Sequence, residues 1–133
     1  MRTVNFGMHD PYVTLGDIVG VLGSRLVSTE WVVRPYTEPN GEKSFDVASD
    51  GQDPLTLASK SGRRFTPNDF VIAASETPQV IWGTFIGYDG KRGSEPWLRI
   101  DVVDSSAFEI SADDAEVHRL IRASFKNVRE GRF

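Results

Sequence analysis

The run Val80–Tyr88 constrains the fold of this chain more than any other part of its sequence. It consists almost wholly of aromatic, β-branched and glycine residues, a composition typical of a strand that is covered on both faces. Asp89-Gly90 follows it with the chemistry of a hairpin turn. Beyond this turn, polar and apolar residues alternate over 97–103, and one face of the alternation holds Leu98, Ile100 and Val102. We therefore expect antiparallel strands, with 80–88 at the centre of a sheet.

Three capping signals place helices in the rest of the chain. Thr14, followed by Asp17, is a variant of the capping box. The stripe that follows at helical spacing is Leu15, Ile18, Val19, Leu22 and Leu26. Thr66-Pro67 opens a second helix, which is short because Thr77-Pro78 closes it. Ser111, followed by Asp114, is expected to cap a final helix.

The remaining strands are expected at Thr3–Phe6, Glu30–Arg34, Ser44–Ala48 and Ala107–Ile110. The stretch Asp50–Arg64 is rich in Gly, Asp, Ser and Pro, which predicts an exposed loop. The predicted order is β-α-β-β-α-β-β-β-α. This order predicts a single α+β domain over 1–133, with a mainly antiparallel sheet of about five to six strands, two longer helices and one short helix.

Composition narrows the classes of partner. The net charge is −4, which argues against nucleic acid because phosphate binding favours a basic surplus. The chain has no cysteine, which excludes disulfides and thiolate chemistry. No apolar run approaches the roughly 20 residues of a spanning helix, and 1–6 lack the apolar stretch of a secretory signal. We expect a cytoplasmic protein with no membrane partner and no cofactor.

Motifs for catalysis or metal binding are absent from the chain. No Gly-x-Ser-x-Gly elbow is present, and Gly90–Ser94 lacks the spacing of a phosphate-binding loop. Asp114 and His118 lie four residues apart on one helix, but no second ligand pair completes a metal site. A capping Asp114 and an exposed His118 explain this pair. Asp101 and Glu109 could lie side by side on neighbouring strands, yet most acids are simply solvated. We assign no catalytic residue and no metal ligand.

Charge is spread unevenly along the chain. The stretch 37–53 carries five acids against one base, Lys43. A second acidic stretch, 101–116, and the basic tail that follows are explained by the dipole of the final helix. The first stretch has no such explanation, and its acids either steer a basic partner or solvate an exposed hairpin. Trp97 beside Arg99 and Asp101 is expected on the surface. The predicted partner-binding residues are Glu38, Glu42, Asp46, Asp50, Asp53, Trp97, Arg99 and Asp101.

Two stretches carry a resemblance to known proteins. Leu98–Ile110, running into a capped helix, and Leu15–Ile18, followed by Trp31, resemble small uncharacterised bacterial α+β proteins. More broadly, the chain resembles the immunity proteins of bacterial polymorphic and contact-dependent toxin systems. This resemblance implies a non-catalytic, cytosolic protein that binds and neutralises a toxin, with a basic toxin domain as its partner.

Two other functions remain open. One is a small-molecule-binding domain or small enzyme with a pocket between sheet and helix, whose residues would be Asp101, Asp104, Glu109 and His118. The other is a structural or assembly subunit.

Overall fold

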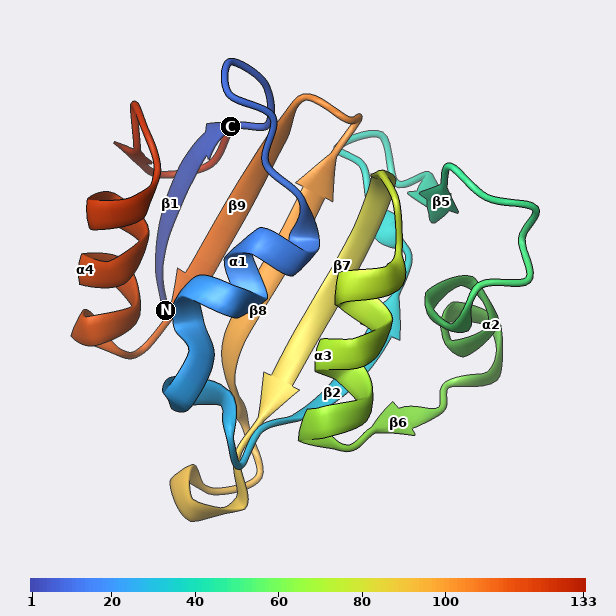
Figure 1. Ribbon diagram of the computed structural model, residues 1–133, viewed down its shortest axis with the longest axis horizontal. Coiled ribbons are helices and arrows are strands. Elements are labelled where there is room, and N and C mark those ends of the chain that lie inside the picture. Colours follow the sequence, from blue (N-terminus) through green and yellow to red (C-terminus); the bar gives the residue numbers. More distant parts are fainter.

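The computed structural model describes residues 1–133 as an eight-stranded antiparallel sheet, a separate two-stranded hairpin and four helices (Figure 1). The strands are β1 (Arg2–Gly7), β2 (Glu30–Arg34), β3 (Tyr36–Thr37), β4 (Lys43–Ser44), β5 (Asp46–Val47), β6 (Arg64–Phe65), β7 (Val80–Tyr88), β8 (Pro96–Val103), β9 (Ala107–Ala112) and β10 (Arg129–Glu130). The helices are α1 (Leu15–Leu22), α2 (Pro54–Ser61), α3 (Pro67–Glu76) and α4 (Ala115–Ser124), with short 3₁₀ turns at Gly23–Leu26 and Gly90–Arg92.

The main sheet has eight strands in the order β10-β1-β9-β8-β7-β2-β6, and β5 pairs with β7 beside this path. Every pairing is antiparallel, and β7 lies inside the sheet. The predicted α+β class and the central position of 80–88 are confirmed. The predicted number of strands was too low, because two-residue strands such as β6 and β10 are too short to show alternation.

Helices α1 and α3 cover one face of the sheet, and α4 lies beside β1 (Figure 1). The expected apolar row of β8 is fully buried, and each such side chain contributes about 1.5–3 kcal/mol relative to exposure. The Trp31 ring on β2 stacks on Phe70 of α3 with centroids 4.2 Å apart. Gly16 lets α1 approach α3 closely, because a Cβ atom there would lie 3.2 Å from the Ala74 carbonyl oxygen. Packing thus compensates for the low helix propensity of glycine.

Two of the three predicted helix starts are confirmed. The Thr14 hydroxyl accepts from the Asp17 N–H at 3.0 Å, and the Asp17 carboxylate accepts from the Thr14 N–H at 2.8 Å. Thr66 caps α3 in the same way. The cap of α4 is Asp114 rather than Ser111. Ser111 instead continues β9, where its hydroxyl bonds that of Thr3 across the sheet at 2.8 Å.

Two other predicted segments differ from the structure. The predicted loop at 50–64 contains α2, which begins with Asp53 as its cap and Pro54 in its first turn and ends at Gly62, where φ is 74°. The predicted return strand at 44–48 is divided between two partners, since β4 pairs with β3 and β5 pairs with β7. None of the four helices is long and apolar enough to span a membrane.

Candidate protein-binding surface

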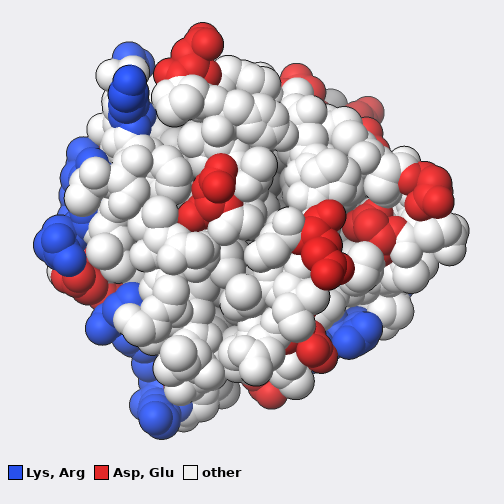
Figure 2. Space-filling model, viewed as in Figure 1, with Lys and Arg blue, Asp and Glu red and all other residues white.

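Five of the six acids predicted to contact a partner lie on one continuous segment of the chain. After β2 the chain leaves the sheet as the β3–β4 hairpin, returns through β5 to pair with β7, and then leads into α2. We call residues 38–53 the acidic segment, and its acids are Glu38, Glu42, Asp46, Asp50 and Asp53. Figure 2 shows acidic groups on the side of β5 and α2, whereas basic groups line the edge formed by α4.

None of these five acids forms an ion pair, although the chain contains ten ion pairs. Glu42, Asp46 and Asp50 are exposed. The second acidic stretch behaves differently, because five of its six acids are paired: Asp101, Glu109, Asp113, Asp114 and Glu116. The negative charge of the acidic segment is therefore not neutralised within the molecule.

The β3–β4 hairpin, which carries Glu38 and Glu42, is fixed to the sheet. The Glu38 carboxylate accepts from the Ser44 hydroxyl at 2.8 Å, and the Glu38 N–H donates to the Glu42 carbonyl at 2.8 Å. Tyr36 is buried, with its ring centroid 5.3 Å from that of Trp82 on β7. These contacts hold the part of the hairpin that carries Glu38 and Glu42 in place before any partner binds, which lowers the entropic cost of binding.

Asp53 has a structural role as well as a charge. It caps α2 and accepts from the Ser49 hydroxyl and from the Thr56 hydroxyl and N–H. Burial opposes its ionisation, but these hydrogen bonds more than offset burial and lower the pKa of Asp53. It stays ionised at neutral pH while being less available to a partner than its exposed neighbours.

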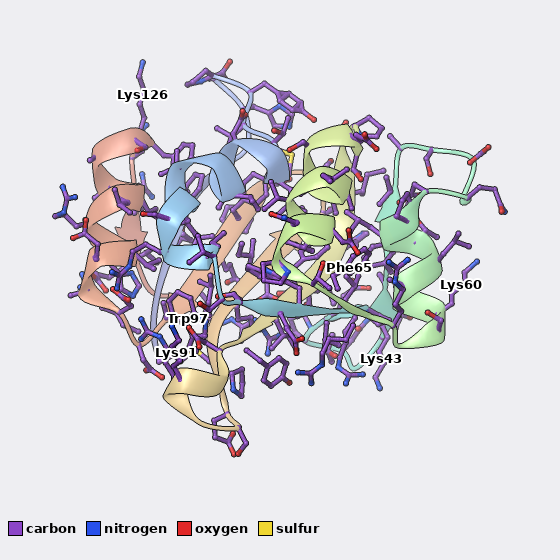
Figure 3. The ribbon with its side chains drawn as sticks, turned by 60° about the horizontal axis from the view of Figure 1, so that its bottom comes forward. Lys43, Lys60, Phe65, Lys91, Trp97 and Lys126 are labelled. Atoms are coloured by element: carbon purple, nitrogen blue, oxygen red, sulfur yellow. The ribbon has the colours of Figure 1, made fainter.

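Trp97, predicted on the surface, is only 2% exposed. The β7–β8 register shifts so that Gly87 pairs with Leu98 and Tyr88 pairs with Pro96, leaving Trp97 in a β-bulge. A bulge changes which face of the sheet a side chain occupies, so the alternation that predicted exposure fails at this residue. The Trp97 indole N–H donates to Thr29 at 3.2 Å. Trp97 lies beside the loop that carries Lys91 (Figure 3), and it is not part of the acidic surface.

Asp101 is also buried, with 2% exposure, and cannot meet a partner directly. It accepts from the Thr84 hydroxyl at 2.5 Å and from the Arg99 guanidinium at 2.9 Å. Arg99 is half-buried beside it. Arg99 and Asp101, both predicted to contact a partner, instead pair with each other on the sheet face opposite α1 and α3. A buried carboxylate needs such a partner.

The residues suspected of forming a pocket between sheet and helix line none of the cavities in the structure. Asp101 and Glu109 are directly opposite each other in the β8–β9 register. Glu109 is 1% exposed and is held by Arg132 and the Phe133 N–H, the latter at 2.8 Å. Asp104 lies apart, in the turn between β8 and β9.

His118, expected to be exposed, is 3% exposed. It lies on the buried side of α4, where its Nε2 is 3.2 Å from the Ala112 carbonyl oxygen. His118 shares the buried face of α4 with Ile121, because residues three apart lie on the same face of a helix. No group of three or more His, Asp or Glu side chains is placed to hold a metal ion.

Sequence reasoning missed the charge cluster at the start of α4. Asp114 accepts from the Glu116 N–H at 2.8 Å and from the Val117 N–H at 3.3 Å. It is also ion-paired with Arg25, after α1, and with Arg92, in the β7–β8 loop. Burial opposes its ionisation, but these hydrogen bonds lower the pKa of Asp114. The cap could be predicted from the sequence. The ion pairs could not, because Arg25 and Arg92 come from segments that are distant in the sequence.

Comparisons with known proteins do not assign this chain to a family. The chain matches no protein-family model, no curated protein and no solved structure.

Proposed function

We propose that this protein is a non-catalytic binding domain that recognises a basic surface of another protein through its acidic segment. One observation carries the proposal. Five acids in 38–53 remain without ion pairs, while the other acidic stretch of the chain is almost fully paired. Unpaired like charges repel one another, so keeping them together is a cost to the isolated domain that a basic partner would remove.

Electrostatics also limits what this surface can do. The Debye length is about 8 Å at physiological ionic strength, so the charges of the acidic segment act on a partner only at close approach. Charges of this kind raise the association rate and suppress wrong partners more than they add affinity. A basic protein fits these properties better than nucleic acid, whose phosphates the segment would repel.

We further propose that the partner is a toxin and that the domain is an immunity protein. This step rests on the broad resemblance of the chain to such proteins, together with the acidic segment. An inhibitor of this kind needs no catalytic group of its own. It acts by covering a basic functional surface of the toxin or by holding the toxin in an inactive form.

The proposal is tested by tagging the protein in its own host and identifying what it retains. We expect one dominant partner in a stoichiometric complex that dissociates as the salt concentration rises. Expressing that partner alone should stop growth of a bacterial test strain, and co-expressing this protein should restore growth. A partner that is harmless when expressed alone would refute the immunity role while leaving the binding role intact. Retention that does not change with salt would refute recognition through the acidic segment.

A further inference from the structure

A row of buried polar side chains crosses the sheet on the face opposite α1 and α3. The strand registers place each member opposite the next on β1, β9, β8 and β7: Asn5, Glu109, Asp101 and Thr84. None of them is more than 8% exposed. Buried polar groups cost free energy unless they are hydrogen-bonded. Asp101 is satisfied from its own and the neighbouring strand, by Arg99 and Thr84, but Glu109 obtains its partners from elsewhere.

Glu109 is held by the segment Gly131–Phe133, which we call the strap. The Arg132 guanidinium donates to both carboxylate oxygens, at 3.2 and 3.4 Å, and the Phe133 N–H donates to one of them at 2.8 Å. Glu109 is 1% exposed, whereas the Arg132 side chain is 62% exposed. The only hydrogen-bond donors to this buried carboxylate therefore come from a segment that itself lies at the surface.

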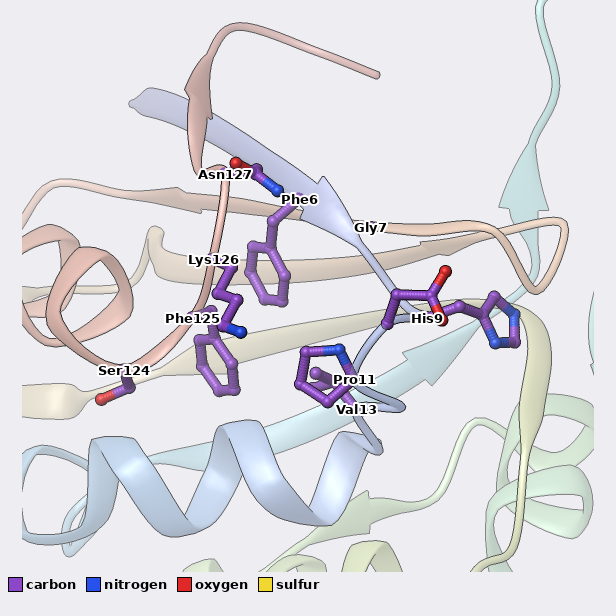
Figure 4. Close-up of a pocket in the computed structure, with 10 residues that line it drawn as sticks. Phe6, Gly7, His9, Pro11, Val13, Ser124, Phe125, Lys126 and Asn127 are labelled. Atoms are coloured by element: carbon purple, nitrogen blue, oxygen red, sulfur yellow. The ribbon is translucent and has the colours of Figure 1, made fainter.

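The same site also binds the main chain of the strap. The Gly131 N–H donates to the Thr3 carbonyl oxygen, and the Gly131 carbonyl oxygen accepts from the Asn5 side chain, both at 2.8 Å. Figure 4 shows the chain beyond Asn127 passing to the side of β1 away from the Phe6 ring. Asn5 lies on that side because successive side chains of a strand alternate. Together these contacts recognise an arginine and the backbone of the residue before it.

The strap can be displaced at a small cost in free energy. Its residues are all exposed, and none belongs to the hydrophobic core. A groove of about 250 Å³ lies beside it, lined in part by Asn5, Arg129 and Phe133. Exposed ion pairs and hydrogen bonds contribute little net free energy, because water replaces them. When the strap leaves, water reaches both oxygens of Glu109, so opening leaves no buried charge without a partner.

We propose that the surface beneath the strap is a binding site for an arginine-containing peptide segment, and that an arginine of another protein can take the place of Arg132. Arginine suits the site because its planar guanidinium donates to both oxygens of one carboxylate, which a lysine cannot match. The strap is then the ligand that the chain supplies to itself. This inference goes beyond the proposed function, because none of these groups belongs to the acidic segment.

The test uses the whole chain with Arg132→Ala and, as the probe, the acetylated and amidated peptide Arg-Glu-Gly-Arg-Phe, the sequence of 129–133. Two-dimensional ¹H–¹⁵N spectra should show saturable shifts of the Asn5 side-chain amide and the Glu109 N–H. The variant should bind the peptide about fivefold more tightly than the native protein, whose own strap competes. A peptide with lysine in place of its second arginine should bind about fivefold more weakly. The proposal is overturned if the variant does not bind the peptide, if the native protein binds it equally well, or if the lysine peptide is equivalent.

Three further variants check the assignment of residues. Adding Glu109→Gln to Arg132→Ala should abolish peptide binding, because it removes the charge that the guanidinium meets. Arg129→Ala is the matched control, since Arg129 is exposed, forms no ion pair and leaves the strap closed. It should bind the peptide as weakly as the native protein does. Arg132→Lys should fold and bind the peptide with intermediate affinity. A chain that unfolds in both Arg132 variants would show that the strap is structural, which contradicts the proposal.

Discussion

Changing Glu38, Glu42 and Asp46 together to lysine should weaken binding to the captured basic partner at least ~100-fold. Each change replaces an attraction by a repulsion, and exposed charge interactions are worth about 0.2–1 kcal/mol each. Three reversals, two on the β3–β4 hairpin and one on β5, therefore add to several kcal/mol. The loss should appear mainly in the association rate and should shrink as salt is added, because salt screens the interaction. Surface plasmon resonance at several salt concentrations measures both quantities.

A matched pair of neutralised variants separates position from net charge. One carries Glu38→Gln, Glu42→Gln and Asp46→Asn, and the other carries Asp10→Asn, Glu95→Gln and Asp104→Asn. The control acids are exposed and unpaired, and Asp10 and Asp104 have left-handed backbones that asparagine accepts. Both variants change the net charge equally. The first should bind more slowly than the second, and equal rates would show that only the net charge of the protein matters.

Replacing Asp114 by alanine should lower the free energy of unfolding by about 3 kcal/mol. The carboxylate accepts from two backbone N–H groups of α4 and from Arg25 and Arg92. It therefore joins α4 to the segment after α1 and to the β7–β8 loop. Its loss removes a helix cap and leaves two guanidinium groups without their anion. Urea unfolding followed by circular dichroism measures the change.

Asp114→Asn separates the two contributions, since asparagine caps a helix about as well as aspartate. This variant should lose only the ionic part and be more stable than Asp114→Ala. Asp113→Ala is the matched control, because the Asp113 side chain, next to Asp114 in the chain, is 61% exposed. It should contribute less than ~1 kcal/mol to the free energy of unfolding. Equal unfolding energies for Asp113→Ala and Asp114→Ala would show that the cluster is not structural.

The Asp114 carboxylate should also make the free energy of unfolding depend on pH. The pKa of Asp114 is lower in the folded protein than its ordinary value of 3.8. The stabilisation from its ionised form is therefore complete above pH ~4 and is lost as pH falls through the lowered folded value. The gap in unfolding energy between the native protein and Asp114→Asn should be constant at neutral pH and close below pH ~4. A gap that widens in acid would contradict this assignment.

Much of the fold could be predicted from the sequence because many of its features depend on residues that are close together in the chain. The Thr14–Asp17 box, the Thr66 cap and the alternation around Ile100 each reflect contacts within one element or a neighbouring strand. The failures involve tertiary structure. Trp97 is buried by a bulge that depends on the register of β7, and no pattern in its own strand indicates that shift.

The candidate surface could be predicted only in part, again because some of its features depend on tertiary structure. The concentration of acids in 38–53 can be read from the sequence, whereas the absence of ion pairs at these acids depends on the fold. Asp101 looked equally acidic and equally accessible, but the partners that bury it come from β7 and from the neighbouring Arg99. The stacking of Phe6 on Phe125 likewise leaves no trace in either segment alone.

The most direct test of the acidic segment as the contact surface is backbone hydrogen exchange with and without the captured partner. We predict that binding slows exchange in 36–53 and leaves β8 and the helices α1 and α3 unchanged. Slowed exchange confined to those other surfaces, with 36–53 exchanging as fast as in the free protein, would contradict the assignment.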